Sequence, residues 1–247
     1  MKSLVKEKDM YKLMAREKRG YTVTDWLKSA HSFSFEQYFD PFNMGFSDLR
    51  AINDNVLFSS SKTESLDISN MEIITLVLDG AIEYKNLNEK SKILTPDQVQ
   101  VISSGTGIIH QEFNPSPVEN THYLQIWILP NKKNIQPCFK RKAFAKEKFL
   151  NKIKLIISGS GKNNSVKIFQ DAEIYKSILE ADKTVYFDIP ENRKLWLQVA
   201  KGAVDVNSNI LEAGDGMSII GEIGEMEING VDLESYFLIF NLRNLTV

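Results

Sequence analysis

One short segment occurs twice in this chain of 247 residues, about half a chain apart. Leu78–Tyr84 matches Ala200–Val206, an offset of 122 residues from position 78 to position 200. Each copy has a glycine at its third position, where it can form a tight turn, and is followed by a second match, of Ile93–Asp97 with Ile210–Asp215. A strand, a glycine turn and a strand that recur in the same order predict two related β-barrels in tandem.

The hydrophobic pattern also favours strands. Short alternating apolar runs separated by polar turns are typical of a sandwich or barrel. The clearest runs are Ile73–Leu78, Val99–Ile102, Tyr123–Leu129 and Leu195–Ala200. Helical periodicity is confined to Met10–Lys18 and Lys140–Asn151, so the sequence predicts an all-β fold with a few short helices.

The boundary between the two predicted barrels follows the proline-containing segment Leu129–Asn134. Residues 1–134 are expected to form the N-terminal barrel and residues 135–247 the C-terminal barrel. The segment 135–152 is basic and loses the alternation, so we expect a connector with a helix there.

Composition narrows the range of partners. The net charge of −2 gives no support for binding nucleic acid or an acidic membrane. The N-terminus lacks the apolar stretch of a signal peptide, and no run approaches the roughly 18 apolar residues that span a bilayer. Cys138 is the only cysteine, which rules out an intrachain disulfide. These features predict a cytoplasmic protein with no membrane or nucleic-acid partner.

The chain contains only three histidines, at positions 31, 110 and 122. His110 and Glu112 stand two residues apart in a strand-like segment, and side chains two apart leave the same face of a strand. An imidazole and a carboxylate on one face are the donors of a divalent metal site. A site that needs two or three imidazoles has few places to find them in this sequence.

Several blocks of the sequence resemble the pirin family, most closely its bacterial, quercetinase-like branch. The blocks are His31–Phe35, Tyr38–Pro41, Met44–Phe46, Leu49–Arg50, Met71–Ile73, Ser103–Pro115, Leu124–Ile128, Phe169–Ala172 and Ala213–Gly216. The resemblance implies a bicupin, which has two cupin barrels and one metal site, in the N-terminal barrel. In the family that site takes a His-x-His pair and a later His-x-Glu, which together supply three imidazoles and one carboxylate.

Carried over by position, His110 and Glu112 match the later pair, but the earlier pair falls on Leu66 and Ile68. Leucine and isoleucine have no lone pair to donate, so neither replaces an imidazole. Glu64, one step earlier on the same predicted face, is a candidate replacement ligand; Asp67 has the opposite parity and should face away. Without a metal, His110 and Glu112 would form a hydrogen-bonded pair or the polar end of a pocket.

Two functions stay open. The first is a non-catalytic bicupin with a degraded metal site that binds a small molecule or a protein, or has a regulatory role, and needs no cofactor. The alternative is a metal-dependent oxygenase of the quercetin 2,3-dioxygenase type, with iron, nickel, copper or zinc as its metal and Glu112 taking the flavonol proton. Structural roles are expected for His31 and His122, and a buried or rim hydrogen bond for Glu72. The sequence does not identify a protein partner.

Overall fold

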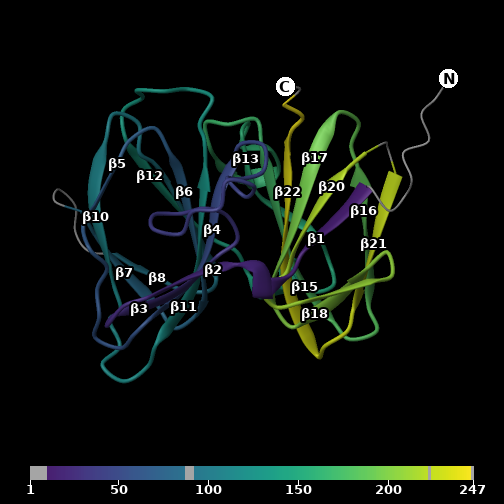
Figure 1. The fold of residues 1–247 in the computed structure, drawn as a ribbon, viewed down its shortest axis with the longest axis horizontal. Helices are drawn as coiled ribbons and strands as arrows, with labels where there is room; N and C mark the ends of the chain where they lie inside the picture. The colour runs from purple at the N-terminus through teal and green to yellow at the C-terminus, as the bar shows by residue number, and fades with distance from the viewer. Residues whose placement is uncertain (1–9, 87–91, 222–223, 246–247) are drawn as a thin grey trace.

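Strands make up nearly all the regular structure of the computed structural model, which describes residues 10–86, 92–221 and 224–245 (Figure 1). The fold has two halves, each with one sheet of seven strands and one of four, and β1 and β12 are exchanged between the two large sheets. The predicted all-β bicupin is confirmed. No helix in these ranges is long and apolar enough to cross a membrane.

In the N-terminal half, the large sheet has the order β12 (Cys138–Ala143), β9 (Gln98–Ser103), β6 (Glu72–Asp79), β11 (Thr121–Ile128), β4 (Leu49–Leu57), β3 (Leu27–His31) and β2 (Gly20–Val23). The small sheet has the order β5 (Leu66–Ile68), β10 (Ile108–Phe113), β7 (Ile82–Asn86) and β8 (Lys92–Leu94).

In the C-terminal half, the large sheet has the order β1 (Tyr11–Met14), β20 (Gly216–Ile220), β17 (Arg193–Lys201), β22 (Glu234–Arg243), β15 (Glu173–Glu180), β13 (Lys154–Ser158) and β14 (Val166–Lys167). The small sheet has the order β16 (Thr184–Ile189), β21 (Gly224–Gly230), β18 (Ala203–Val206) and β19 (Asn209–Glu212). Three short 3₁₀ turns also occur in the described residues, η1 (Arg16–Lys18), η2 (Lys146–Lys148) and η3 (Lys162–Asn164).

The sequence repeat corresponds to a repeated structural unit. Gly80 lies between β6 and β7, and Gly202 lies between β17 and β18. Their φ angles of 76° and 68° are left-handed, a conformation that glycine adopts without steric cost. The same turn thus passes the chain from the large sheet to the small sheet in both barrels.

The two helix predictions were wrong. Met10–Lys18 contains β1 and η1, and Lys140–Asn151 contains the end of β12 and η2. Both strands pair along a large sheet, β1 with β20 of the C-terminal half and β12 with β9 of the N-terminal half. Tertiary pairing therefore overrides the local helical pattern. Each strand pairs across the predicted division at residue 134, β1 with a strand beyond it and β12 with a strand before it, and the division itself stays a prediction.

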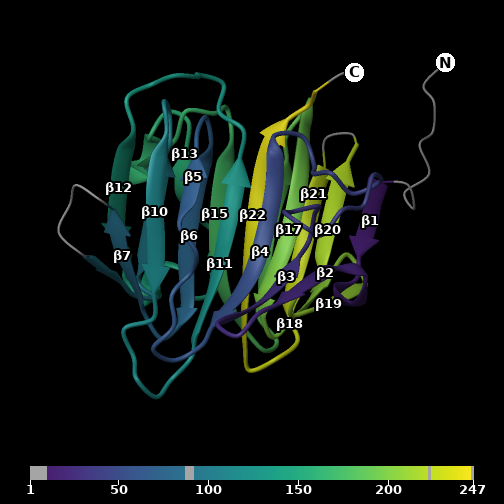
Figure 2. The ribbon, with the colours of Figure 1, turned by 60° about the vertical axis from the view of Figure 1, so that its left-hand side comes forward.

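The two large sheets pack against each other through an apolar layer. Side chains of β6 and β11, such as Ile74 and Ile126, are buried together with Ile174 of β15 and Phe240 of β22. The two halves of the chain lie side by side in both ribbon views (Figure 1, Figure 2). The interface between the barrels is thus a hydrophobic core in its own right.

Glu72 of β6 is a buried acid at this interface. It is 1% exposed, accepts a hydrogen bond from Ser103 Oγ at 2.8 Å, and also accepts one from the backbone N–H of Phe169 in the other half. The predicted buried hydrogen bond is confirmed. Burial raises the pKa of Glu72 from 4.5 to about 7, against the smaller opposing effect of its hydrogen bonds.

This raised pKa predicts a pH-dependent stability. The folded state holds the Glu72 proton more tightly than the unfolded chain. The contribution of Glu72 to the free energy of unfolding is therefore fully present below about pH 4.5 and is lost as the pH rises through 7. Compared with wild type, Glu72→Gln should gain roughly 3 kcal/mol in free energy of unfolding between about pH 4.5 and pH 8. Urea unfolding across this range measures the change, and a difference that does not vary with pH would contradict it.

Candidate functional site

The predicted pair lies on β10, inside the N-terminal barrel. His110 and Glu112 are each 2% exposed, whereas their strand neighbour Gln111 is half-buried. The alternation of the strand therefore points both side chains inward, as the spacing predicted.

Glu112 is held by donors on both of its carboxylate oxygens. Tyr123 Oη donates to Oε2 at 2.7 Å, and Gln125 Nε2 donates to Oε1 at 2.9 Å. Trp127 Nε1 in turn donates to Gln125 Oε1 at 2.9 Å, which fixes the amide orientation. Burial raises the pKa of Glu112, and these two hydrogen bonds oppose that shift only in part. The carboxyl group is therefore fixed in place by side chains of β11.

The surroundings of His110 differ from those of Glu112 in hydrogen bonding. Both of its ring nitrogens are buried without a hydrogen-bond partner among the described residues. The imidazole stacks on Tyr84 of β7, with ring centroids 5.0 Å apart and planes 24° apart. Burial lowers the pKa of His110 to about 4, so the ring is neutral at physiological pH. A neutral imidazole with two unpartnered nitrogens is either a cost to the fold or a free ligand position.

Leu66 and Ile68, the positions to which the resemblance carries the earlier ligand pair, have apolar side chains that pack in the barrel, Leu66 in part and Ile68 almost fully buried. Leu66 is the register partner of His110 across β5 and β10. Ile68 is 6% exposed and packs with Ile73, Tyr84 and Ile102. Aliphatic packing thus occupies the two positions at which the resemblance led us to expect the earlier His-x-His pair.

Glu64 is not grouped with His110 and Glu112 in the part of the chain that the structure describes. It is exposed just before β5, whereas Asp67 is exposed on the opposite face, as its parity predicted. Across the described ranges, no group of three His, Cys, Asp or Glu side chains is arranged to hold an ion. A set of three imidazoles and a carboxylate does not fit residues that offer one imidazole and one carboxylate with both oxygens engaged.

A cavity of about 160 Å³ opens beside Glu112 in this barrel. Strands β3, β4 and β11 of the large sheet contribute six polar side chains to its lining, and the loops and strands around its opening contribute the others. The lining residues are Thr22, Thr24, Trp26, Leu27, Ser29, His31, Phe35, Glu36, Gln37, Asn53, Asn55, Thr63, Glu64, Leu66, Glu112, Tyr123 and Gln125. His110 is not one of them, so the structure brings Glu112 and Glu64, but not His110, to the lining of the cavity.

His31 forms part of this wall. It hydrogen-bonds with Asn53 Oδ1 through Nδ1 at 2.8 Å and with Thr22 Oγ1 through Nε2 at 2.9 Å. Burial lowers the pKa of His31, so the ring is a neutral hydrogen-bonding group. His31 was expected to be structural; its place in the cavity wall was not predicted.

The sequence also did not predict the polar side chains that β4 and β11 contribute to the wall of this cavity. Asn53 and Asn55 stand two apart on β4, and Tyr123 and Gln125 stand two apart on β11. Polar residues at period two within an otherwise apolar strand were the available signal. The strand pairing that places these two faces over one cavity cannot be read from either segment alone.

His122 lies outside the cavity. Its Nε2 is 2.5 Å from Asp54 Oδ1, and Asp54 also accepts from Arg19 Nη1 at 3.0 Å. Strand parity places His122 and Asp54 on the opposite face from Tyr123 and Gln125. This arrangement agrees with the structural role expected for His122.

Two barrels in tandem, with a polar cavity in the N-terminal one, define a bicupin. The Pirin family profile matches residues 13–128, and the profile for the quercetinase C-terminal cupin domain matches residues 155–242. The chain belongs to the pirin family.

Named relatives agree with this assignment. A quercetin 2,3-dioxygenase of Escherichia coli (strain K12) is 35% identical over 94% of this chain and 99% of that protein. A pirin-like protein of Caulobacter vibrioides is 38% identical over 83% of this chain and 89% of that protein. The crystal structure of the bacterial pirin YhhW from Escherichia coli in complex with nickel(II) matches with a TM-score of 0.89 and 35% identity, covering 96% of this chain and all of that one.

Proposed function

We propose that this protein is a pirin-family bicupin whose N-terminal barrel binds a small polar molecule and has lost metal-dependent oxygenation. The observation that carries the proposal is the occupation of two family ligand positions by Leu66 and Ile68, which are packed into the barrel. The carboxylate of Glu112 supports it further, because its two oxygens already accept hydrogen bonds from Tyr123 and Gln125.

The cavity suggests the class of ligand. Its volume of about 160 Å³ is below the roughly 300–1,000 Å³ of pockets that hold drug-sized molecules. Carboxylates of Glu36, Glu64 and Glu112 line it, and both partial desolvation and the charge of Glu64 raise the pKa of Glu36. A concentration of acceptors at one opening favours a small amine or polyol over an anion.

The alternative is a metal-dependent quercetin 2,3-dioxygenase. Two observations favour it: relatives with that name match along nearly the whole chain, and His110 offers two free nitrogens. It requires a metal held by fewer protein donors than the family pattern supplies.

The deciding experiment is elemental analysis of untagged protein purified without chelator, together with flavonol consumption after incubation with nickel(II) or iron(II). We expect a metal-to-protein ratio far below one and no flavonol consumption. A ratio near one, with flavonol turnover that is lost in His110→Ala, would overturn the proposal in favour of the dioxygenase.

The ligand class has its own test. Ethanolamine is expected to bind the wild-type protein in a calorimetric titration, and Glu64→Gln should weaken that binding several-fold by removing a negative charge at the cavity. The matched control is Asp67→Asn, which removes an equal charge nearby on the opposite face of the strand. Equal effects of the two variants would mean that ethanolamine responds to the general surface charge and not to this cavity.

A further inference from the structure

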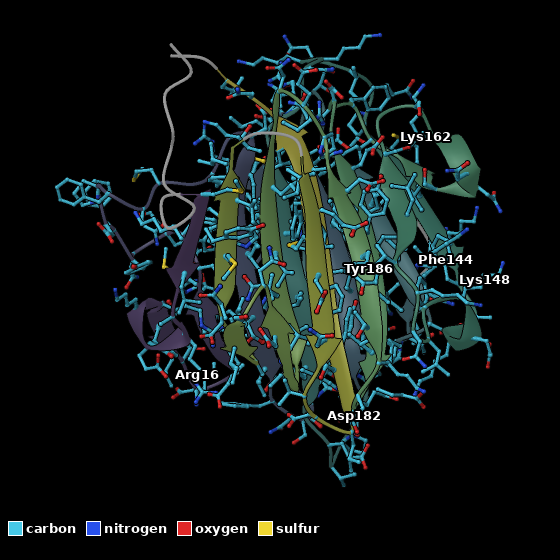
Figure 3. All side chains as sticks on the ribbon, turned by 90° about the vertical axis from the view of Figure 1, so that its right-hand side faces the viewer. Arg16, Phe144, Lys148, Lys162, Asp182 and Tyr186 are labelled. Carbon is cyan, nitrogen blue, oxygen red and sulfur yellow. The ribbon has the colours of Figure 1, made fainter. Side chains whose placement is uncertain are left out.

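A second cavity lies between the two barrels and shares no lining residue with the first. It has a volume of about 320 Å³. The N-terminal half contributes Val77, Leu78, Pro96 and Asp97; the C-terminal half contributes Lys176, Ile178, Lys201, Glu234 and Tyr236. The segment that joins the barrels adds Phe144, Lys146 and Phe149, and Phe144 is labelled at this segment in Figure 3.

Lys176 is an uncommitted cation in this cavity. It is 7% exposed, and its Nζ lies 4.6 Å from the ring centroid of Phe149 and 4.5 Å from that of Tyr236. Within the described ranges, its ammonium group has no hydrogen-bond or ion-pair partner. The two rings compensate a buried charge only in part.

The charged neighbours do not neutralise Lys176. Burial lowers its pKa to about 8; the charges of Lys146 and Lys201 act in the same direction, and only Asp97 opposes them. Lys146 is paired with Glu234 at 2.5 Å, and Lys201 Nζ donates to the carbonyl oxygen of Leu78 at 2.9 Å. The three lysines and two acids that line the cavity leave one positive charge in excess.

Tyr236 adds a second unused donor. Its side chain is 7% exposed, and its hydroxyl group is buried without a hydrogen-bond partner among the described residues. Burial raises the pKa of Tyr236, so the phenol keeps its proton and can donate it in a hydrogen bond. The Lys176 ammonium lies 4.5 Å from the centroid of the same ring, so both donors belong to the same side of the cavity.

We propose that this cavity binds a small monocarboxylic acid with an apolar body. The carboxylate accepts hydrogen bonds from Lys176 Nζ and Tyr236 Oη, and the apolar body packs against Phe144, Phe149 and Ile178. A single negative charge matches the single excess positive charge. Because both barrels line the cavity, the bound acid contacts both of them. This site is independent of the proposed function of the N-terminal barrel.

Calorimetric titration with benzoate, phenylacetate and hexanoate tests the proposal, with phenylacetamide as the uncharged counterpart of phenylacetate. We expect saturable binding of at least one of the acids. Phenylacetamide should bind about tenfold or more weakly than phenylacetate, since it lacks the charge that the ammonium group recognises. No saturable binding of any of the three acids at millimolar concentration, or equal binding of acid and amide, overturns the proposal.

Two variants locate the site. Lys176→Met keeps the apolar stem and should weaken binding of the acid about tenfold or more, whereas Tyr236→Phe removes one donor and should weaken it several-fold. The matched control is Lys140→Met, which removes a half-buried lysine that lies over Phe169 and donates to the carbonyl oxygen of Lys167, outside this cavity. Unchanged affinity in both cavity variants, or an equal loss in the control, overturns the assignment. If Lys176→Met does not fold, Tyr236→Phe still tests the site.

Discussion

Replacing Leu66 and Ile68 together by histidine is expected to raise the affinity of the protein for nickel(II) by about a thousandfold or more. Leu66 lies directly opposite His110 in the strand register, and Ile68 lies two residues further along the same strand face. The double variant therefore places two more imidazoles beside that of His110, whose ring nitrogens have no hydrogen-bond partner among the described residues. Each added ligand contributes a large part of the binding free energy of a four-donor site.

The matched control is Ser65→His together with Asp67→His. It has the same two-residue spacing on the same segment, but both positions are exposed on the opposite face. Any nickel bound by an exposed histidine pair is measured by this control. Metal binding is followed by titration and by elemental analysis, and His110→Ala in the Leu66→His, Ile68→His background should abolish the gain.

A folded double variant that binds no more nickel than its control would contradict this expectation. That result would mean that the hydrogen bonds from Tyr123 and Gln125 prevent Glu112 from turning toward a metal. Without metal, the double variant should be less stable than the wild type, because Ile68 is almost fully buried and a histidine at this position would bury a polar ring with no metal to bind.

The fold could be predicted because its signals are local. Period-two alternation marked the strands, and the glycine turn at Gly80 and Gly202 marked the repeat. The segments taken for helices, by contrast, are governed by remote partners: β1 pairs with β20, more than two hundred residues away in the sequence, and β12 pairs with β9. Edge strands of this kind depend on the hydrogen bonds that a distant strand offers, which local periodicity does not report.

The functional sites, like the fold, were predictable only where the signal is local in the sequence. Strand parity was sufficient to place His110 and Glu112 on one face, and Asp67 on the other. It could not reveal that Tyr123 and Gln125 hold the carboxylate while His110 has no partner. The cavity around Lys176 was missed entirely, because it exists only where the two barrels and their connecting segment meet.

His110→Phe is expected to stabilise the protein at neutral pH, by about 1–3 kcal/mol in free energy of unfolding. The substitution removes two buried nitrogens that have no partner and keeps an aromatic ring for the stack with Tyr84. His31→Phe is the matched control with the opposite expected sign, because both nitrogens of His31 are hydrogen-bonded, to Asn53 and Thr22.

The advantage of His110→Phe should grow as the pH falls. Burial lowers the pKa of His110 from 6.5 to about 4, so between these values the unfolded chain binds a proton that the folded protein does not. The contribution of the neutral His110 ring to the free energy of unfolding is therefore fully present above about pH 6.5 and is lost as the pH falls toward 4. The variant has no imidazole at this position, so it does not undergo this loss. The difference between variant and wild type should therefore widen by roughly 2–3 kcal/mol between about pH 7.5 and pH 4.5. Chemical denaturation at both pH values measures it. Destabilisation by His110→Phe at neutral pH would show that the imidazole has a partner in solution, and would reopen the metal site.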